Sequence, residues 1–300
     1  MEGNSMNNIC IVGAGNMGHQ IALNAALAGF KVICTDVNEE VLQKAKQFVS
    51  NYLPERVSKG KLKQADAEAA KANLIFTSDL AEAAREADLV IEAVIEKLEI
   101  KRQLFAQLDS LCPPHTILAT NSSYIVSSKI VDVTSRPEKV CNMHFFNPAL
   151  VMKLVEVVKG PHTSEDTTST LMDICVRMGK TSVLLKQEIY GFLVNRILVA
   201  IRNEAIHLLD MGIASHDDID RAVTLALGHL LGPFGLMDLT GIDLTYYRGL
   251  ERYQETGDPA DRPSPTIVQK FINKEWGRKM AGDFTIILKK IENDVIEMHI

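Results

Sequence analysis

The residues best suited to chemistry lie between Asn142 and Val158, a stretch that holds one histidine and one carboxylate. His144 stands near the end of an apolar run, and Glu156 lies in the middle of a second strand-like run. Side chains on adjacent strands can be neighbours in space, so this pair can form a base and its orienter. Taken alone, the stretch fits a satisfied core histidine and an edge-strand glutamate better. The case for chemistry therefore depends on the residues that precede it.

Composition excludes several classes of protein. A chain of 300 residues suits two domains, or one large domain with an appendage. The apolar share of 46% is ample for buried cores, and the net charge of −6 does not suggest a nucleic-acid or anionic-membrane surface. No apolar run approaches the roughly 18 residues of a transmembrane helix.

The cysteines and the first residues indicate a compartment. The five cysteines are odd in number, far apart and without a Cys-x-x-Cys pair, which favours reduced core thiols. The segment Met1–Asn8 lacks the features of a signal or transit peptide. We therefore expect a cytoplasmic protein.

A glycine turn stands in the context that dinucleotide binding requires. The apolar strand Asn8–Val12 runs into Gly13-Ala14-Gly15-Asn16-Met17-Gly18, and an apolar helical pattern follows as far as Gly29. A second strand, Lys31–Thr35, ends at Asp36. Strand, glycine turn, helix, strand and terminal acid in this order predict a site for a dinucleotide.

Each position of the turn has a separate role. Gly13 permits the tight turn, Gly15 lets the backbone approach a pyrophosphate, and Gly18 lets the helix pack on the strand. Asn16 and Met17 open the helix, whose unpaired N–H groups and partial positive charge attract phosphate. We expect all five residues to bind the cofactor.

Asp36 selects between the two nicotinamide dinucleotides. Its carboxylate would accept hydrogen bonds from the adenosine ribose hydroxyls and repel a 2′-phosphate. No arginine follows it, since the next residues are Val37 and Asn38. The sequence therefore favours NAD over NADP.

The segment 53–73 is polar, helix-forming and rich in lysine and alanine, and it predicts a helical insertion beside the sheet. Lys59, Lys61 and Lys63 cluster within it. For any single lysine, a solvated helical face is the simpler interpretation. The alternative is a cationic arm that meets a phosphorylated substrate tail.

Further polar residues follow the next two strands. Asp88–Val94 is a nearly continuous apolar run, typical of a parallel sheet covered on both faces. Glu96 and Lys101 come after its carboxyl end, where doubly wound sheets bind ligands. A helix-start carboxylate and a surface lysine explain them nearly as well. Ser123 lies in a hydroxyl-rich turn after the strand Thr116–Thr120, at the same edge.

The chain changes character near residues 186–190. Strand and helix alternate up to that point, and helical patterns dominate from Gly191 onward, interrupted by an expected loop from Gly228 to Gly241. We predict an α/β Rossmann-like, doubly wound, mostly parallel sheet with a helical insertion in residues 1–187. An all-α domain in residues 188–300 follows, with a plausible oligomer surface.

The chain resembles the L-3-hydroxyacyl-CoA dehydrogenases, in the short-chain or 3-hydroxybutyryl-CoA form. The resemblance spans about residues 8 to 280 in one order and spacing. It is carried by the glycine turn, Ala87–Val94 with Glu96, Ala119–Ser123, His144-Phe145-Phe146-Asn147-Pro148, Met152–Val157, Gly191–Arg196 and Gly232–Asp238. It implies NAD as cofactor, an acyl-CoA as substrate and a homodimer formed through the helical domain.

The resemblance also implies roles for single residues. His144 would remove the proton of the substrate 3-hydroxyl, and Glu156 would hold its imidazole and stabilise the imidazolium. Ser123 and Asn195 would hydrogen-bond the reacting oxygen and the thioester region. Glu96, Lys101 and Ser123 would contact the nicotinamide end of NAD.

Three positions depart from the family pattern. Tyr190 replaces the proline that usually precedes the Gly-Phe pair, and Tyr124 stands in the serine turn where Asn-Thr-Ser-Ser-Leu is usual. Both concern acyl-chain preference and rate. The usual C-terminal glycine motif is present only in altered form, at Gly277–Thr285.

Two other functions fit part of the pattern. One is a relative that acts on a free 3-hydroxy acid, as in the gulonate 3-dehydrogenase-like branch. The other is a dinucleotide-binding structural or sensor protein without catalysis, as lens crystallins of this lineage suggest. Retention of both His144 and Glu156 argues against the second, since a protein without catalysis has no reason to keep a partly buried charge pair.

Overall fold

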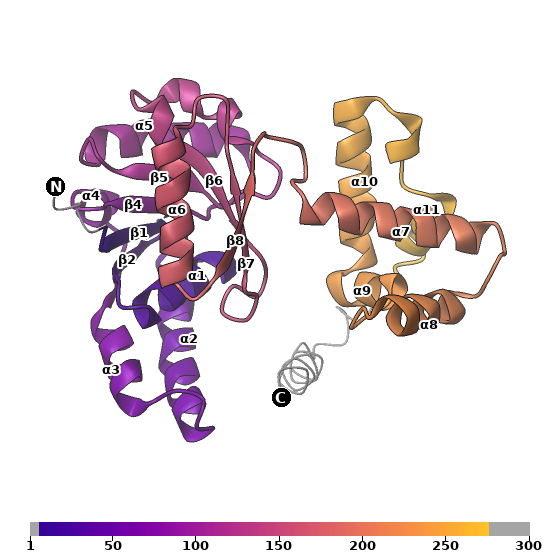
Figure 1. Ribbon diagram of the computed structural model, residues 1–300, viewed down its shortest axis with the longest axis horizontal. Coiled ribbons are helices and arrows are strands. Elements are labelled where there is room, and N and C mark those ends of the chain that lie inside the picture. The colour runs from indigo at the N-terminus through magenta and orange to yellow at the C-terminus, as the bar shows by residue number, and fades with distance from the viewer. Residues whose placement is uncertain (1–5, 276–300) are drawn as a thin grey trace. The chain divides into compact units, whose positions relative to one another are not determined.

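The computed structural model describes residues 6–275. The chain forms two compact units, which divide between Val194 and Asn195. The first unit combines strands and helices, and the second is helical (Figure 1). The α/β, doubly wound class expected from the sequence is confirmed.

One eight-stranded sheet forms the centre of the first unit, in the order β3-β2-β1-β4-β5-β6-β7-β8. Neighbouring strands are parallel except β6 and β7, which are antiparallel. The strands are β1 (Asn8–Val12), β2 (Lys31–Thr35), β3 (Leu74–Thr77), β4 (Leu89–Glu92), β5 (Ile117–Thr120), β6 (Val140–Phe145), β7 (Leu154–Val158) and β8 (Thr181–Leu185).

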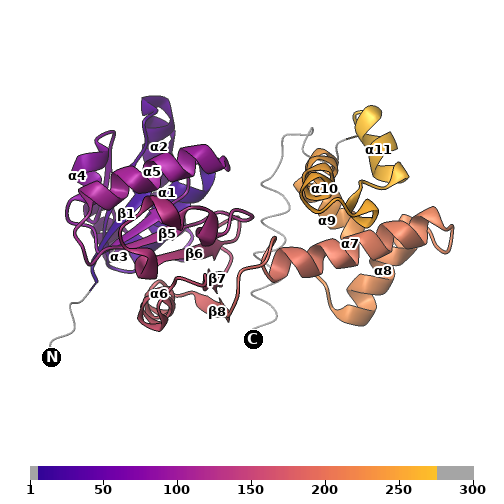
Figure 2. The same ribbon diagram turned by 90° about the horizontal axis from the view of Figure 1, so that it is seen from above.

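Apolar side chains alternate between the two faces of the sheet, as strand geometry requires. In β1, for example, Ile11 belongs to the core beneath α1 and α6, while Cys10 belongs to the core beneath α4 and α5. Helices α5 and α6 thus lie on opposite sides of the sheet (Figure 2). The helices of this unit are α1 (Asn16–Leu27), α2 (Glu39–Ser58), α3 (Gln64–Ala72), α4 (Leu80–Ala84), α5 (Leu98–Leu111) and α6 (Glu165–Arg177), with short 3₁₀ helices η1 (Ser127–Lys129), η2 (Val131–Val133) and η3 (Pro137–Lys139).

Polar side chains fix the starts of several helices. Asn38 accepts from the N–H of Glu40 at 2.9 Å, and Asp79 accepts from the N–H of Glu82 at 3.0 Å. Each cap of this kind stabilises a helix by about 1 kcal/mol.

The predicted helical insertion is a hairpin of α2 and α3, which lie side by side and extend away from the sheet (Figure 1). Helix α2 continues to Ser58, within the segment expected to form the insertion. Lys59, Lys61 and Lys63 are all exposed between the two helices.

The second unit contains α7 (Val194–Asp210), α8 (His216–Leu227), α9 (Pro233–Thr240), α10 (Ile242–Thr256), η4 (Pro259–Asp261) and α11 (Pro265–Ile272). The expected loop from Gly228 to Gly241 is therefore wrong, because it contains α9. A proline is tolerated in the first turn of a helix, and the Asp220 carboxylate accepts the N–H groups of Phe234 and Gly235.

Among residues 6–275, no helix is both long and apolar enough to cross a membrane. The altered glycine motif at 277–285 lies outside the described residues.

Candidate active site

The antiparallel pairing of β6 and β7 sets His144 directly opposite Glu156. His144 Nδ1 lies 2.8 Å from Glu156 Oε2. His144 is 4% exposed, and Glu156 is fully buried. The structure therefore brings together the two residues that the sequence singled out for chemistry.

Backbone N–H groups hold the other oxygen of Glu156. Leu193 and Val194 donate to Oε1 at 3.0 and 2.9 Å. The turn that aims them includes Phe192, whose φ of 50° is positive and whose fully buried ring lies 5.4 Å from the His144 ring. Three donors thus satisfy the hydrogen-bonding capacity that this carboxylate would otherwise lose on burial. These contacts could not be predicted from the sequence, because backbone donors have no side-chain signature.

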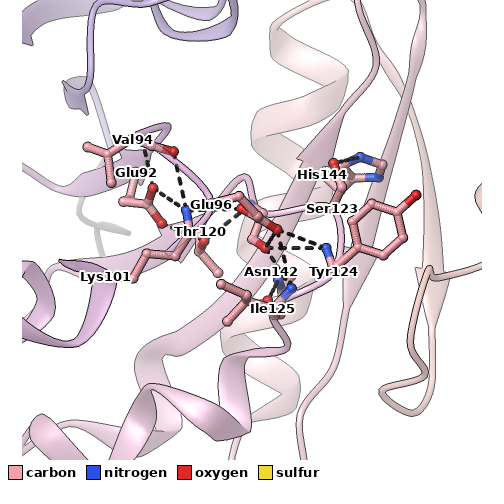
Figure 3. Close-up of polar contacts among 11 residues, drawn as sticks. Glu92, Val94, Glu96, Lys101, Thr120, Ser123, Tyr124, Ile125, Asn142 and His144 are labelled. Atoms are coloured by element: carbon pink, nitrogen blue, oxygen red, sulfur yellow. Dashed lines mark hydrogen bonds and ion pairs between the residues drawn. The ribbon is translucent and has the colours of Figure 1, made fainter. Parts of the chain in front are cut away.

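Ser123 contacts the His144 imidazole on the side opposite Glu156. Its Oγ lies 3.0 Å from His144 Nε2 (Figure 3). The Glu156 carboxylate can only accept, so it fixes the proton of the neutral ring on Nδ1. Nε2 is then an acceptor that faces a hydroxyl. A substrate hydroxyl at this place would meet the same acceptor.

A second charged cluster lies at the end of β4. Lys101 is 1% exposed, and its Nζ lies 2.6 Å from Glu92 Oε1 and 3.4 Å from Glu96 Oε2 (Figure 3). The carbonyl of Val94 lies 3.5 Å from the same Nζ. The interpretation of Lys101 as a surface lysine is therefore wrong.

This cluster anchors the turn that carries Ser123. Glu92 Oε2 accepts from Thr120 Oγ1 at 2.6 Å, and Thr120 Oγ1 accepts from the N–H of Ser122 at 3.2 Å. Glu96 Oε1 accepts from the Ser122 hydroxyl and from the N–H of Tyr124 (Figure 3). The sequence analysis missed Glu92. An acid inside a continuous apolar strand was the signal that could have identified it.

The glycine turn has the close contacts and the open space that a dinucleotide needs. A Cβ on Gly13 would lie 2.7 Å from the carbonyl oxygen of Ala93, and one on Gly18 would lie 1.7 Å from the carbonyl oxygen of Gly13. A Cβ on the exposed Gly15 would meet nothing within 4 Å. No side chain caps the start of α1, so its N–H groups face this open space. The turn therefore fits the pyrophosphate of NAD.

Asp36 and Asn16 border the same space. Asp36 Oδ2 accepts from the N–H of Ala14 at 2.8 Å, which links the end of β2 to the glycine turn. The exposed Asn16 donates to Asn147 Oδ1 at 3.0 Å, which links the turn to the connection between β6 and β7. Met17 is half-buried against the core beneath α1.

Asn195 is the one predicted site residue that belongs to the other compact unit. It is the second residue of α7 and follows Val194, whose N–H binds Glu156. Its role stays a prediction.

A glycine turn at the carboxyl edge of a parallel sheet, followed by a hydroxyl-facing histidine with its carboxylate, defines the class of dinucleotide-dependent dehydrogenases. Comparison with known proteins narrows this class. The 3-hydroxyacyl-CoA dehydrogenase NAD binding domain matches residues 8–189, and the C-terminal domain of the same enzymes matches residues 191–286. The chain belongs to the NAD-dependent 3-hydroxyacyl-CoA dehydrogenase family.

Individual relatives agree with this assignment. A probable 3-hydroxybutyryl-CoA dehydrogenase of Bacillus subtilis is 39% identical over 274 residues, which cover 91% of this chain and 94% of that protein. The mitochondrial hydroxyacyl-coenzyme A dehydrogenase of Rattus norvegicus is 38% identical, with 92% and 90% covered. The crystal structure of (S)-3-hydroxybutyryl-CoA dehydrogenase from Ralstonia eutropha is 34% identical, with a TM-score of 0.86 and 92% and 97% covered.

Proposed function

We propose that this enzyme transfers a hydride between NAD and C3 of a short-chain L-3-hydroxyacyl-CoA, with His144 as general acid and base. The observation that carries the proposal is the environment of His144. Its Nδ1 is held by the buried Glu156, and its Nε2 faces the Ser123 hydroxyl at 3.0 Å. The names of the Bacillus subtilis and Ralstonia eutropha relatives support a four-carbon acyl chain.

Oxidation of a secondary alcohol needs proton loss from oxygen together with hydride loss from carbon. His144 Nε2 takes the proton of the 3-hydroxyl, and the Glu156 carboxylate stabilises the imidazolium that forms. Bound NAD supplies the hydride acceptor at its nicotinamide ring. In the reducing direction, the protonated His144 returns the proton to the ketone oxygen.

Polar groups around the dyad orient the substrate. The Ser123 hydroxyl hydrogen-bonds the reacting oxygen, and Asn195 contacts the thioester region. Positioning of this kind contributes much of the rate acceleration of such reactions. Glu96 would contact the nicotinamide end of NAD, and the buried Lys101 would support that contact by holding Glu96.

The exposed Lys59, Lys61 and Lys63 form a cationic arm for the phosphates of CoA. The three lysines lie in the connection between α2 and α3, and Lys59 also pairs with Glu55. Clustered lysines attract phosphate through charge, and this attraction weakens as ionic strength rises.

We also propose a domain division at residues 1–187 and 188–300, with the second domain serving substrate binding and dimerisation. Large apolar side chains of the helical unit are exposed, among them Ile213 at 63%, Leu225 at 79% and Leu227 at 66%. Exposed apolar residues of this kind fit a homodimer surface. Light scattering of the purified protein tests this: the mass of a monomer would contradict it.

All five cysteines are buried free thiols. Free thiols persist in a reducing compartment, which supports a cytoplasmic location. Fractionation of the producing cells tests the location, and recovery of the protein in another compartment would contradict it.

Steady-state reduction of acetoacetyl-CoA, with NADH and NADPH compared, tests the proposed function. We expect turnover with acetoacetyl-CoA and a preference for NADH. Turnover of free hydroxy acids alone would favour the gulonate 3-dehydrogenase-like alternative. NAD binding without any turnover would favour a protein that has lost catalysis.

A further inference from the structure

The two positions at which the serine turn and the Gly-Phe turn depart from the family pattern contact each other. The rings of Tyr124 and Tyr190 lie 5.0 Å apart between centroids, at an interplanar angle of 41°. Tyr124 directly follows Ser123, which faces His144. Two contacting rings thus occur at the residue after Ser123 and at position 190, where the family pattern has a serine and a proline.

The backbone of Tyr124 is held in place. Its N–H lies 3.1 Å from Glu96 Oε1 and 3.3 Å from Ser122 Oγ, and Ile125 donates to Ser122 Oγ at 2.7 Å. Figure 3 shows Tyr124 beside Ser123, with its backbone in this network. These contacts fix the backbone from which the Tyr124 ring projects, and they belong to the network that also positions Ser123.

The chain on either side of Tyr190 is held as well. Before it, Glu188 Oε1 accepts from Ser127 Oγ at 2.8 Å and from the N–H of Ser128 at 2.9 Å. After it, Leu193 and Val194 donate to the buried Glu156. Tyr190 thus lies between two anchors, both of which belong to the unit that carries His144.

We propose that Tyr124 and Tyr190 form a specificity-determining wall that admits four-carbon acyl groups and excludes longer straight chains. The inference rests on the proposed function. His144 Nε2 and Ser123 Oγ mark the place of the reacting oxygen, and C3 is bonded directly to that oxygen. The groups attached to C3 therefore begin close to Ser123, the residue before Tyr124. A longer chain must displace two rings that contact each other and project from backbone that is held on both sides.

Ring-removing variants test the wall. The variants are Tyr124→Ser, Tyr190→Ala and the double substitution, with Tyr190→Pro in reserve if Tyr190→Ala does not fold. The measurement is kcat/KM for acetoacetyl-CoA and for 3-ketodecanoyl-CoA in each variant. One methylene in an apolar site changes kcat/KM by about tenfold or more, so we expect the ratio of the long to the short substrate to rise at least tenfold.

Tyr124→Phe and Tyr190→Phe are the matched controls, because they keep the rings and remove only the hydroxyls. We expect their substrate ratios to equal that of the wild type. The proposal would be wrong if the ratio of kcat/KM for the long to the short substrate were unchanged in the ring-removing variants. It would also be wrong if this ratio rose equally in the phenylalanine variants. Failure of the proposed function is a separate result, namely a wild-type enzyme that does not reduce acetoacetyl-CoA.

Discussion

Two buried charged pairs flank the Ser123 turn, and they differ in whether a nitrogen remains available to a substrate. In the pair of Lys101 and Glu92, the ammonium has three N–H donors and three oxygen neighbours within 3.5 Å. In the pair of His144 and Glu156, Nδ1 is bound to the carboxylate, while Nε2 meets only a serine hydroxyl among the described hydrogen bonds.

This difference separates a positioning pair from a catalytic one. Removal of two charges from water is costly, and a buried pair adds little stability over apolar residues of similar volume. The Lys101 pair is saturated and serves to hold the turn. The His144 pair keeps one nitrogen that a substrate hydroxyl can reach, which is what proton transfer requires.

Substitution of the catalytic histidine gives the largest expected effect. His144→Gln removes the base, so kcat should fall by about 10²-fold or more. NADH affinity, measured by fluorescence titration, should stay nearly unchanged, because the glycine turn is intact. A variant with more than about a tenth of the wild-type activity would show that the role is misassigned.

Removal of the lysine from the saturated pair should act on stability. Lys101→Met leaves Glu92 buried without its cation, which costs about 3–5 kcal/mol in the free energy of unfolding. Chemical denaturation measures this loss, and the double variant Glu92→Gln/Lys101→Met should recover most of it.

Lys159→Met is the matched control for that stability loss. Lys159 pairs with Glu165, whose side chain is 77% exposed, so its loss should cost under about 1 kcal/mol. Equal losses for the two lysines would show that the burial of Lys101 is unimportant.

Asp36 is a half-buried carboxylate, more exposed than Glu92 and less exposed than Glu165. Its substitution should have a smaller effect than that of Lys101. Asp36→Ala should weaken NAD binding about tenfold through the lost hydrogen bonds and reduce the preference over NADP. Ser164→Ala, which removes the cap of α6 beside the amino end of β6, is the control. If the Asp36 variant keeps the wild-type ratio of NAD to NADP affinity, the residue does not contact the ribose.

Lys180 is a buried cation with carbonyl partners in place of carboxylates, and its effect on stability depends on pH. Its Nζ donates to the carbonyls of Ala149 and Met152 at 2.6 and 2.9 Å, and burial lowers the pKa of Lys180 to about 8. Between this value and the ordinary 10.5, the unfolded chain binds the proton more than the folded protein does. The contribution of Lys180 to stability therefore rises with pH across this window.

Denaturation of the wild type and of Lys180→Met at pH 7.5 and 9.5 measures that contribution. The free energy of unfolding of the wild type, minus that of Lys180→Met, should be larger at pH 9.5 than at pH 7.5. A difference that is constant or moves the other way would show that the charge of Lys180 is not penalised by burial.

The parts of the site that could be predicted from the sequence have local signatures. The glycine turn and Asp36 lie within one strand-helix-strand unit, so spacing alone indicates their arrangement. His144 and Glu156 lie on two strands joined by a short connection, and pairing of those strands brings them together.

The contacts that could not be predicted are long-range or involve the backbone. Glu92 meets Thr120 only because β4 and β5 are neighbours in the sheet, with these residues as partners in register. Leu193 and Val194 bind Glu156 through N–H groups that every residue except proline has. Helix α9 was missed because its glycines and Pro233 are typical of a loop, while its cap comes from Asp220 in α8.

A crystal structure of the enzyme with NAD and acetoacetyl-CoA tests the central claim most directly. We expect the ketone oxygen at C3 to lie within hydrogen-bonding distance of His144 Nε2 and Ser123 Oγ, with Glu156 still bound to Nδ1. A ketone oxygen bound away from the imidazole, or a His144 ring turned away from Glu156, would contradict it.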